Sequence, residues 1–167
     1  MRRGMQYVTL QDCYEELFQI AMEFDASERA PDYRSNRKGL QELEGILKRV
    51  RESWYRGLIV KAAYLFVAIC KGHLFINGNK RLSLIITLDF LYRNGFTRQK
   101  PVTRRSYRRW FAAEFPQYVL VNRRLPSTYG WAYYNLNKAI ASDTVNSFND
   151  LKWKVEKFLR FSVTKGF

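Results

Sequence analysis

The sequence predicts an all-α protein that folds as a single domain. Apolar residues recur at helical spacing along most of the chain, and no run alternates between polar and apolar residues as a half-buried strand does. At 167 residues, with 47% hydrophobic and 16% aromatic content, the chain is long enough to bury one core. It has no internal repeat and no linker long enough to divide it, so we expect residues 1–167 to form one helical domain.

Two amphipathic helices are expected in the N-terminal part. Thr9 followed by Asp12 is typical of an N-cap with an acidic first turn, and apolar residues then continue at helical spacing as far as Phe24. Residues 26–39 form a polar connection. The second helix is marked by its apolar residues, Leu40, Leu43, Ile46, Leu47 and Val50.

Two central, buried helices are expected next, at residues 58–70 and 80–93. Apolar residues surround the first on all sides apart from Lys61, and the second has the same character, so neighbouring elements should cover both. The second ends at Asn94-Gly95, a favourable helix C-terminus because glycine tolerates the left-handed conformation. The polar stretch "HLFINGNKR", residues 73–81, lies between these two apolar segments.

Residues 97–167 are expected to form a basic, helical C-terminal part. One helix there has an aromatic side and an arginine side, and Pro116 closes it. Ser127 and Ser147 are expected to cap the two helices that follow. The aromatic side of the first helix consists of Tyr107, Trp110, Phe111 and Phe115.

The chain is strongly basic, with a formal net charge of +14. Residues 1–92 hold 14 Lys and Arg against 11 Asp and Glu, whereas residues 93–167 hold 15 against 4. Such an excess suggests a polyanionic partner or an acidic protein surface. An exposed polar face, with docking of an acidic protein or RNA as the alternative, is expected at Arg104, Arg105, Arg108 and Arg109.

The two cysteines, Cys13 and Cys70, occupy apolar-facing positions of predicted helices, so we interpret them as small buried residues rather than as a disulfide or as metal ligands. This usage fits a reducing compartment, and we expect a cytoplasmic protein. No segment approaches the uninterrupted apolar run of a membrane span, so no membrane association is expected.

The polar stretch combines groups that hold an anion with one that moves a proton. A loop that ends in Gly78-Asn79 and runs into a buried helix presents backbone N–H groups at the helix N-terminus, where the dipole favours an anion. Gly78 permits close approach of a phosphate, Asn79 caps the helix or donates to the ligand, and Lys80 and Arg81 add positive charge. His73 is the only histidine of the chain, and imidazole is the usual proton acceptor near neutral pH.

These residues resemble the motif of the Fic/Doc family, H-x-F-x-(D/E)-(G/A)-N-(G/K)-R, which stands at the start of a central helix. The resemblance is strongest over residues 56–96, and it implies the all-α Fic/Doc fold with two buried helices flanking the motif. The matching residues are His73, Phe75, Gly78, Asn79, Lys80 and Arg81.

The resemblance implies a transferase that uses ATP to modify a Ser, Thr or Tyr hydroxyl of an intracellular target protein. His73 would be the general base, Phe75 the structural anchor of the loop, and Gly78 with its neighbours the phosphate-binding group. Lysine at position 80 is typical of the Doc-like toxin branch, which favours phosphate transfer over AMP transfer. Toxins of this branch are restrained by a separate antitoxin, so an antitoxin is an expected partner.

Asn77 departs from the family pattern, in which Asp or Glu holds Mg²⁺ at this position. A neutral amide is a poorer ligand for this hard cation than a carboxylate. Two alternatives to an active transferase therefore stay open. One is a catalytically weakened Fic-fold module that binds nucleotide or a partner protein, and the other is a basic nucleic-acid-associated protein that keeps the motif as a relic.

Overall fold

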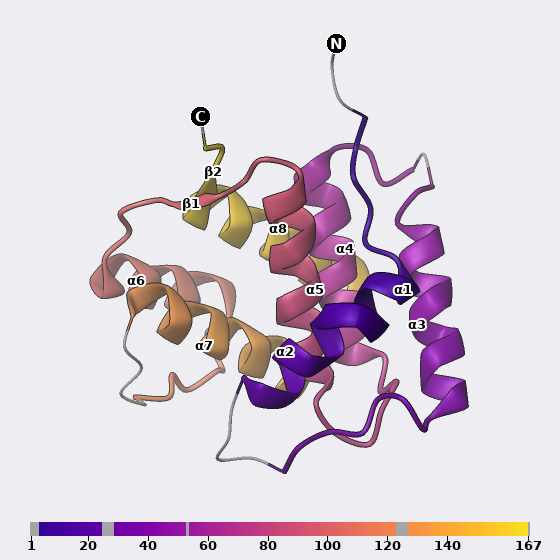
Figure 1. Cartoon of the computed structure of the whole chain (residues 1–167). Coiled ribbons are helices and arrows are strands. Elements are labelled where there is room, and N and C mark those ends of the chain that lie inside the picture. Colours follow the sequence, from indigo (N-terminus) through magenta and orange to yellow (C-terminus); the bar gives the residue numbers. More distant parts are fainter. Residues whose placement is uncertain (1–3, 25–28, 53, 123–126, 167) are drawn as a thin grey trace.

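A computed structural model describes residues 4–24, 29–52, 54–122 and 127–166 of the chain, and α-helices dominate these residues (Figure 1). This confirms the predicted all-α class. One small addition, absent from the sequence-based prediction, is a pair of two-residue antiparallel strands, β1 (Arg98–Gln99) and β2 (Val163–Thr164). Through this pairing, the segment just after α5 lies beside the C-terminal end of the chain.

The first helical rod begins where the sequence predicted. Thr9 and Asp12 form a reciprocal capping box, with the Thr9 side chain accepting from the Asp12 backbone N–H. The rod then runs through α1 (Leu10–Asp12), a π-helical turn η1 (Cys13–Leu17) and α2 (Phe18–Glu23). The π turn is marked by the Phe18 N–H, which donates to the Cys13 carbonyl.

Helix α3 (Arg37–Arg49) begins earlier than its first apolar residue suggested, because the Asn36 side chain accepts from the Gly39 backbone N–H and caps it. The polar connection therefore ends at Asn36, and residues 26–28 of that connection lie outside the described residues. The apolar stripe of α3 is buried as predicted, in Leu40, Leu43, Ile46 and Leu47.

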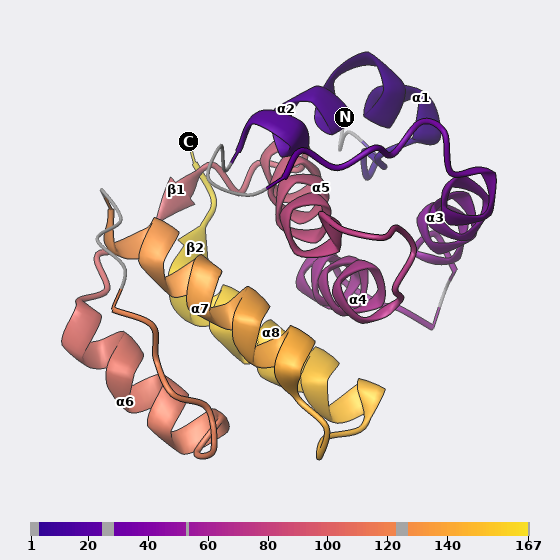
Figure 2. The ribbon, with the colours of Figure 1, turned by 90° about the horizontal axis from the view of Figure 1, so that it is seen from below.

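Helices α4 (Leu58–Lys71) and α5 (Asn79–Arg93) form the buried centre, as predicted. Figure 2 shows them between α1–α3 on one side and α7 and α8 on the other. Lys61, the one charged residue of the apolar part of α4, is buried, and its ammonium donates to the carbonyl oxygens of Val50 and Glu52 just beyond α3. A buried lysine thus satisfies carbonyl groups at a helix C-terminus.

Three further helices complete the fold: α6 (Arg104–Glu114), α7 (Thr128–Ser142) and α8 (Phe148–Ser162). The predicted caps Ser127 and Ser147 are confirmed, since their side chains accept from Gly130 and Asp150 backbone N–H groups. Helix α8 packs on α4, α7 lies against both central helices, and α6 is outermost on that side (Figure 2).

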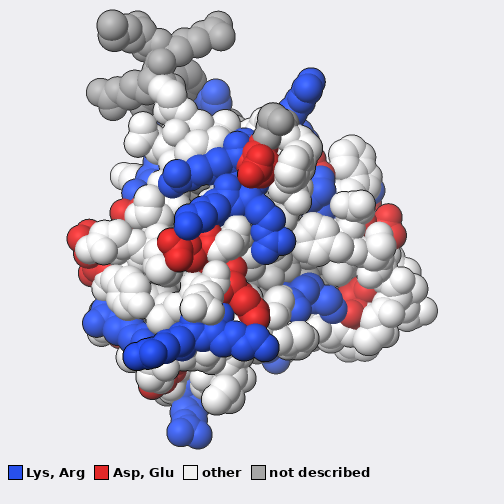
Figure 3. Space-filling model, turned by 90° about the vertical axis from the view of Figure 1, so that its right-hand side faces the viewer, with Lys and Arg blue, Asp and Glu red and all other residues white. Residues whose placement is uncertain are grey.

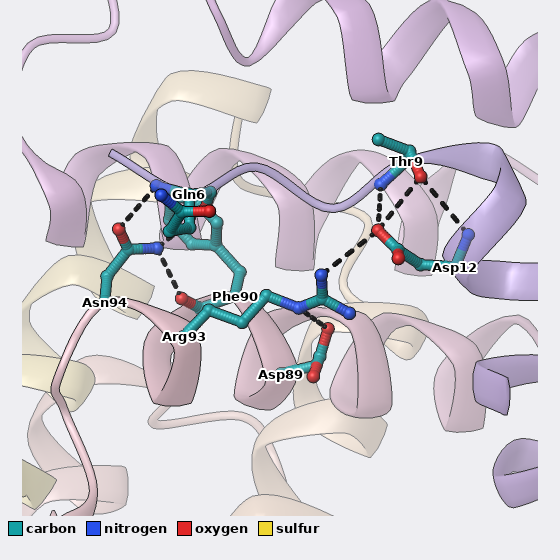
Figure 4. A network of polar contacts seen from close by, with 7 residues as sticks. All are labelled: Gln6, Thr9, Asp12, Asp89, Phe90, Arg93 and Asn94. Atoms are coloured by element: carbon teal, nitrogen blue, oxygen red, sulfur yellow. Dashed lines mark hydrogen bonds and ion pairs between the residues drawn. The ribbon is translucent and has the colours of Figure 1, made fainter. Parts of the chain in front are cut away.

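The N-terminal segment is fastened to the C-terminal end of α5 (Figure 4). The Asn94 side chain accepts from the Gln6 N–H at 2.9 Å and donates to the Gln6 carbonyl at 2.8 Å, as a neighbouring strand would. The preceding residue, Arg93, bridges Asp12 at 3.2 Å and Asp89 at 2.6 Å. These contacts hold the first helical rod against α5.

None of the described helices is both long and apolar enough to cross a lipid bilayer.

Candidate functional site

The loop between α4 and α5 is closed by one side chain at its base. Asn79 accepts a hydrogen bond from the Phe75 N–H at 3.0 Å and donates to the Phe75 carbonyl at 2.7 Å. The predicted capping or ligand-donating residue therefore fixes the loop internally, across residues 75–79. The loop lies at the end of the α4–α5 pair that faces the viewer in Figure 2.

Phe75 anchors this loop in the core. Its side chain is buried, and its ring packs edge-on against Tyr33 at 4.9 Å and Phe18 at 6.4 Å between centroids. Phe18 and Tyr33 are themselves stacked at 4.9 Å. Helix α3 approaches from another side at Gly39, where an added Cβ would lie 2.4 Å from the Leu74 carbonyl oxygen and 2.8 Å from the Phe75 ring. Three segments thus hold the loop in one position.

Gly78 begins α5 in a left-handed conformation with φ of 79°. A Cβ at this position would lie 2.5 Å from the Tyr33 hydroxyl and 2.6 Å from Pro31 Cβ. The Tyr33 hydroxyl also donates to the Gly78 carbonyl at 2.8 Å. Glycine is required here by its backbone conformation and by packing against the segment before α3, whereas the sequence predicts only the close approach of a phosphate.

His73 is exposed and has a positive φ of 48°, the one non-glycine residue with this feature in the described chain. It borders a hollow of about 280 Å³. Its position on the loop leaves the imidazole accessible to a ligand. The hollow is lined by Cys70, His73, Ile76, Asn77, Gly78, Asn79, Lys80, Arg81 and Ala141.

Asn77 and Arg81 converge on one backbone oxygen. The Asn77 Nδ2 and the Arg81 Nη2 donate to the Arg29 carbonyl at 3.1 and 2.9 Å, and Arg81 is buried. The two side chains that the motif places toward a metal and a phosphate are therefore tied to residue 29, which the sequence-based prediction did not include.

The described donor set around the hollow does not fit a protein-held Mg²⁺ ion. Among residues 4–24, 29–52, 54–122 and 127–166, no carboxylate lines the hollow, and the Asn77 amide nitrogen donates to the Arg29 carbonyl. Across the described residues, no cluster of three or more His, Cys, Asp or Glu side chains is placed to hold a metal. Mg²⁺ prefers hard oxygen ligands, and the lining offers amides and cations instead.

The start of α5 is suited to an anion. Its N-cap is Gly78, and no side chain caps it, whereas Asn36, Thr103, Ser127 and Ser147 cap α3, α6, α7 and α8. Lys80 follows in the first turn and borders the same hollow. The helix dipole and an uncapped first turn both favour a negatively charged ligand.

Cys70 lines the hollow but has no nucleophilic character. Burial raises the pKa of its thiol to about 12, and its Sγ faces the Asn137 carbonyl at 3.7 Å. Burial likewise raises the pKa of Cys13 to about 12. Both cysteines are free and buried, which confirms their predicted character as small core residues.

Three larger hollows, of about 540, 500 and 470 Å³, lie away from the loop residues that carry the chemistry. The first lies between the end of α6, the end of α7 and α8, the second between α3, α4 and Phe148, and the third beside β2. The smaller hollow is the candidate site, because it alone among these brings His73 and the start of α5 together.

The arginines on the polar face of α6 differ in what they contact. The guanidinium groups of Arg104 and Arg108 lie 5.3 and 5.4 Å from the centre of the buried Trp131 ring, and Arg108 also donates to Asn122. Arg105, Arg108 and Arg109 are exposed as predicted, and Arg104 is half-buried. Two of the four arginines therefore help to cover a core tryptophan, which their helical spacing did not indicate.

Positive and negative side chains are mixed on one side of the molecule. Figure 3 shows the side of the molecule that carries α3 in Figure 1, where Lys and Arg are interspersed with Asp and Glu. On α3, Lys38 pairs with Glu42 and Lys48 with Glu44, at 3.9 and 3.3 Å. This mixture agrees with the near balance of charge in the N-terminal half of the sequence.

Sequence reasoning missed the residues that hold the loop from the segment before α4: Arg29, Pro31, Tyr33 and Gly39. No periodicity or motif marks them, because their role depends on contacts with a loop about forty residues away in the chain.

Comparison with known proteins finds one family model that matches the segment containing the site. Residues 9–91 match the model of the Fic/DOC family, so the match begins at the Thr9 cap, ends within α5 and includes the loop with His73. It extends further toward the N-terminus than the segment 56–96 over which the sequence resemblance was strongest. No curated protein and no solved structure matches the chain.

Proposed function

We propose that this chain is a Fic-type transferase that moves a phosphate or AMP from ATP to a hydroxyl side chain of a target protein. The observation that carries the proposal is the folding of residues 73–81 within the family-matched segment. The loop brings an exposed His73 and the uncapped start of α5 to one hollow of about 280 Å³. A proton acceptor and an anion-binding helix end are what such a reaction needs.

In the proposed reaction, His73 accepts the proton of the target hydroxyl as its oxygen attacks a phosphorus atom of ATP. Attack at the γ phosphorus forms the phosphoester and breaks the bond to ADP, which leaves. Attack at the α phosphorus forms the AMP ester and releases pyrophosphate. In both cases the backbone N–H groups at the start of α5 and the ammonium of Lys80 stabilise negative charge on the phosphate oxygens.

The segment before α3 helps to position two side chains of the site, because the Arg29 carbonyl accepts hydrogen bonds from Asn77 and Arg81. Arg81 therefore contributes to binding as a buried positive charge held beside the hollow. The described lining residues include no carboxylate that would hold a metal ion.

Lys80 supports a finer proposal, that the protein belongs to the Doc-like branch and transfers phosphate. In this proposal the protein is a toxin that a separate antitoxin restrains. An intracellular target protein belongs to the same proposal. The exposed Arg105 and Arg109 offer a docking surface for an acidic partner.

The test uses ATP labelled separately at the α and γ phosphates, incubated with the protein and a cell extract. Label retained on protein from the γ position supports phosphate transfer, and label from the α position supports AMP transfer. The control is His73→Asn, which should transfer neither. Absence of labelled protein together with absence of ATP binding would overturn the proposal.

A second candidate function is a nucleotide-binding module without transfer activity. Asn77 favours it, because its amide donates to the Arg29 carbonyl and no carboxylate of the described residues lines the hollow. ATP binding by the parent protein, without label transfer from either position, would select this function.

A further inference from the structure

Ile76 is the most exposed large apolar side chain in the described part of the chain. Its exposed fraction is 99%, compared with 82% for Val119 and 74% for Val145. A side chain this exposed removes almost no apolar surface from water, so it adds nothing to the hydrophobic stabilisation of the fold. Packing of the core therefore does not explain why an apolar residue stands at this position.

The backbone around Ile76 is held firmly, although its side chain touches little. Phe75 on one side is buried and hydrogen-bonded twice to Asn79, and Asn77 on the other donates to Arg29. Ile76 therefore projects from a loop that is fixed at both neighbouring residues. An apolar group held in place in this way loses little conformational entropy when a partner covers it.

The position of Ile76 relates it to the candidate chemistry. It lines the same hollow as His73 and Lys80, yet it is almost fully open to solvent. A small ligand inside the hollow contacts its walls, whereas only a partner that lies over the rim can bury a side chain this exposed.

We infer that Ile76 is a docking contact for the acceptor polypeptide, which would bury it with an apolar side chain near the hydroxyl presented to His73. This inference rests on the proposed transferase function and adds a determinant of the acceptor to it. A polypeptide fits better than the nucleotide because it spans both the rim and the hollow, and apolar contacts at an interface centre carry much of its affinity.

The test compares the parent with Ile76→Thr, which keeps the β-branched shape but replaces apolar surface by a hydroxyl. Val119→Thr is the matched control, because Val119 is also highly exposed but borders the hollow between α6 and α8. The initial rate of label transfer from ATP is measured at increasing concentrations of extract protein. ATP affinity and sedimentation are measured for the same three proteins.

The expected result is that Ile76→Thr requires about fivefold more extract protein for a half-maximal rate. Its ATP affinity and its sedimentation should match those of the parent. Val119→Thr should match the parent in extract dependence, ATP affinity and sedimentation. An extract dependence within twofold of the parent would overturn the inference while leaving the transferase function intact. Weaker ATP binding, or a change in sedimentation, would also overturn it, because Ile76 would then contact nucleotide or a second copy.

The two proposals fail in distinguishable ways. If the parent labels no acceptor, the transferase function fails and the docking role of Ile76 fails with it. If the parent and Ile76→Thr label equally well at every extract concentration, only the docking role is lost.

Discussion

The Tyr33 hydroxyl donates a hydrogen bond of 2.8 Å to the carbonyl oxygen of Gly78, the residue on which α5 begins. Burial raises the pKa of Tyr33, with the nearby charge of Arg81 opposing the shift, so the hydroxyl stays protonated and remains a donor. This bond joins the segment before α3 to the anion-binding end of the central helix. The geometry of the site therefore depends on a part of the chain far from the motif.

Tyr33→Phe should remove this hydrogen bond while keeping the aromatic packing with Phe18 and Phe75. We expect the free energy of unfolding in urea to fall by about 1 kcal/mol, because the Gly78 carbonyl loses a partly buried donor. Tyr92→Phe is the control, since Tyr92 is 67% exposed, and its effect should stay within about 0.5 kcal/mol. Equal stability of the two variants would contradict a structural role for the Tyr33 hydroxyl.

Gly78→Ala should destabilise the protein more than Gly95→Ala. Both glycines have positive φ, 79° and 87°, so each variant should lose about 1 kcal/mol from backbone strain. Only the Cβ at position 78 meets Tyr33 and Pro31, whereas nothing lies within 4 Å at position 95. We expect Gly78→Ala to lose about 1–3 kcal/mol more in denaturant unfolding. Similar losses would show that the segment before α3 does not pack as described.

His73→Gly should separate stability from activity. The φ of 48° is strained for histidine and not for glycine, and the side chain is exposed, so stability should not fall and should rise by up to about 1 kcal/mol. Under the proposed function, the rate of label transfer should decrease by about 10²–10⁴ because the general base is lost. Thermal unfolding and transfer assays on the same preparation measure both effects. Retention of full transfer would remove His73 from its proposed role.

Asp12→Asn should lower the stability of the folded protein at neutral pH but not in acid. Burial by itself would raise the pKa of Asp12, but hydrogen bonds from Thr9 and the charge of Arg93 outweigh it and lower the pKa below its ordinary value. The ionised carboxylate therefore stabilises the folded state above the unfolded pKa of about 3.9, and this stabilisation is lost as the pH falls through the lower folded value.

We expect Asp12→Asn to unfold about 1 kcal/mol more easily than the parent at pH 7. The difference should shrink steadily below about pH 4, because the parent then loses the same charge. Urea unfolding of both proteins from pH 7 to pH 2.5 measures this difference. A difference that is constant over the whole range would show that the ionised state of Asp12 contributes nothing to folding.

The local features of this fold could be predicted from sequence because they are encoded by residues close together in the chain. Thr9, Ser127 and Ser147 cap helices within three residues of their own positions, and the all-round apolar composition of α4 and α5 marks them as buried. The motif itself is local, so sequence placed His73 and the start of α5 near each other. The strand pair β1–β2 escaped prediction because two residues carry no recognisable alternation.

The tertiary structure alone decided how the site is held. The Tyr33–Gly78, Asn77–Arg29 and Arg81–Arg29 contacts join residues 45, 48 and 52 positions apart, and Gly39 of α3 packs against Leu74 of the loop. Sequence by itself determined which residues bear the candidate chemistry and which helices are buried, because spacing and capping act over one or two turns. It could not determine the partners of Asn77, Gly78 and Arg81, since these depend on packing that brings distant segments into contact only when the whole core has formed.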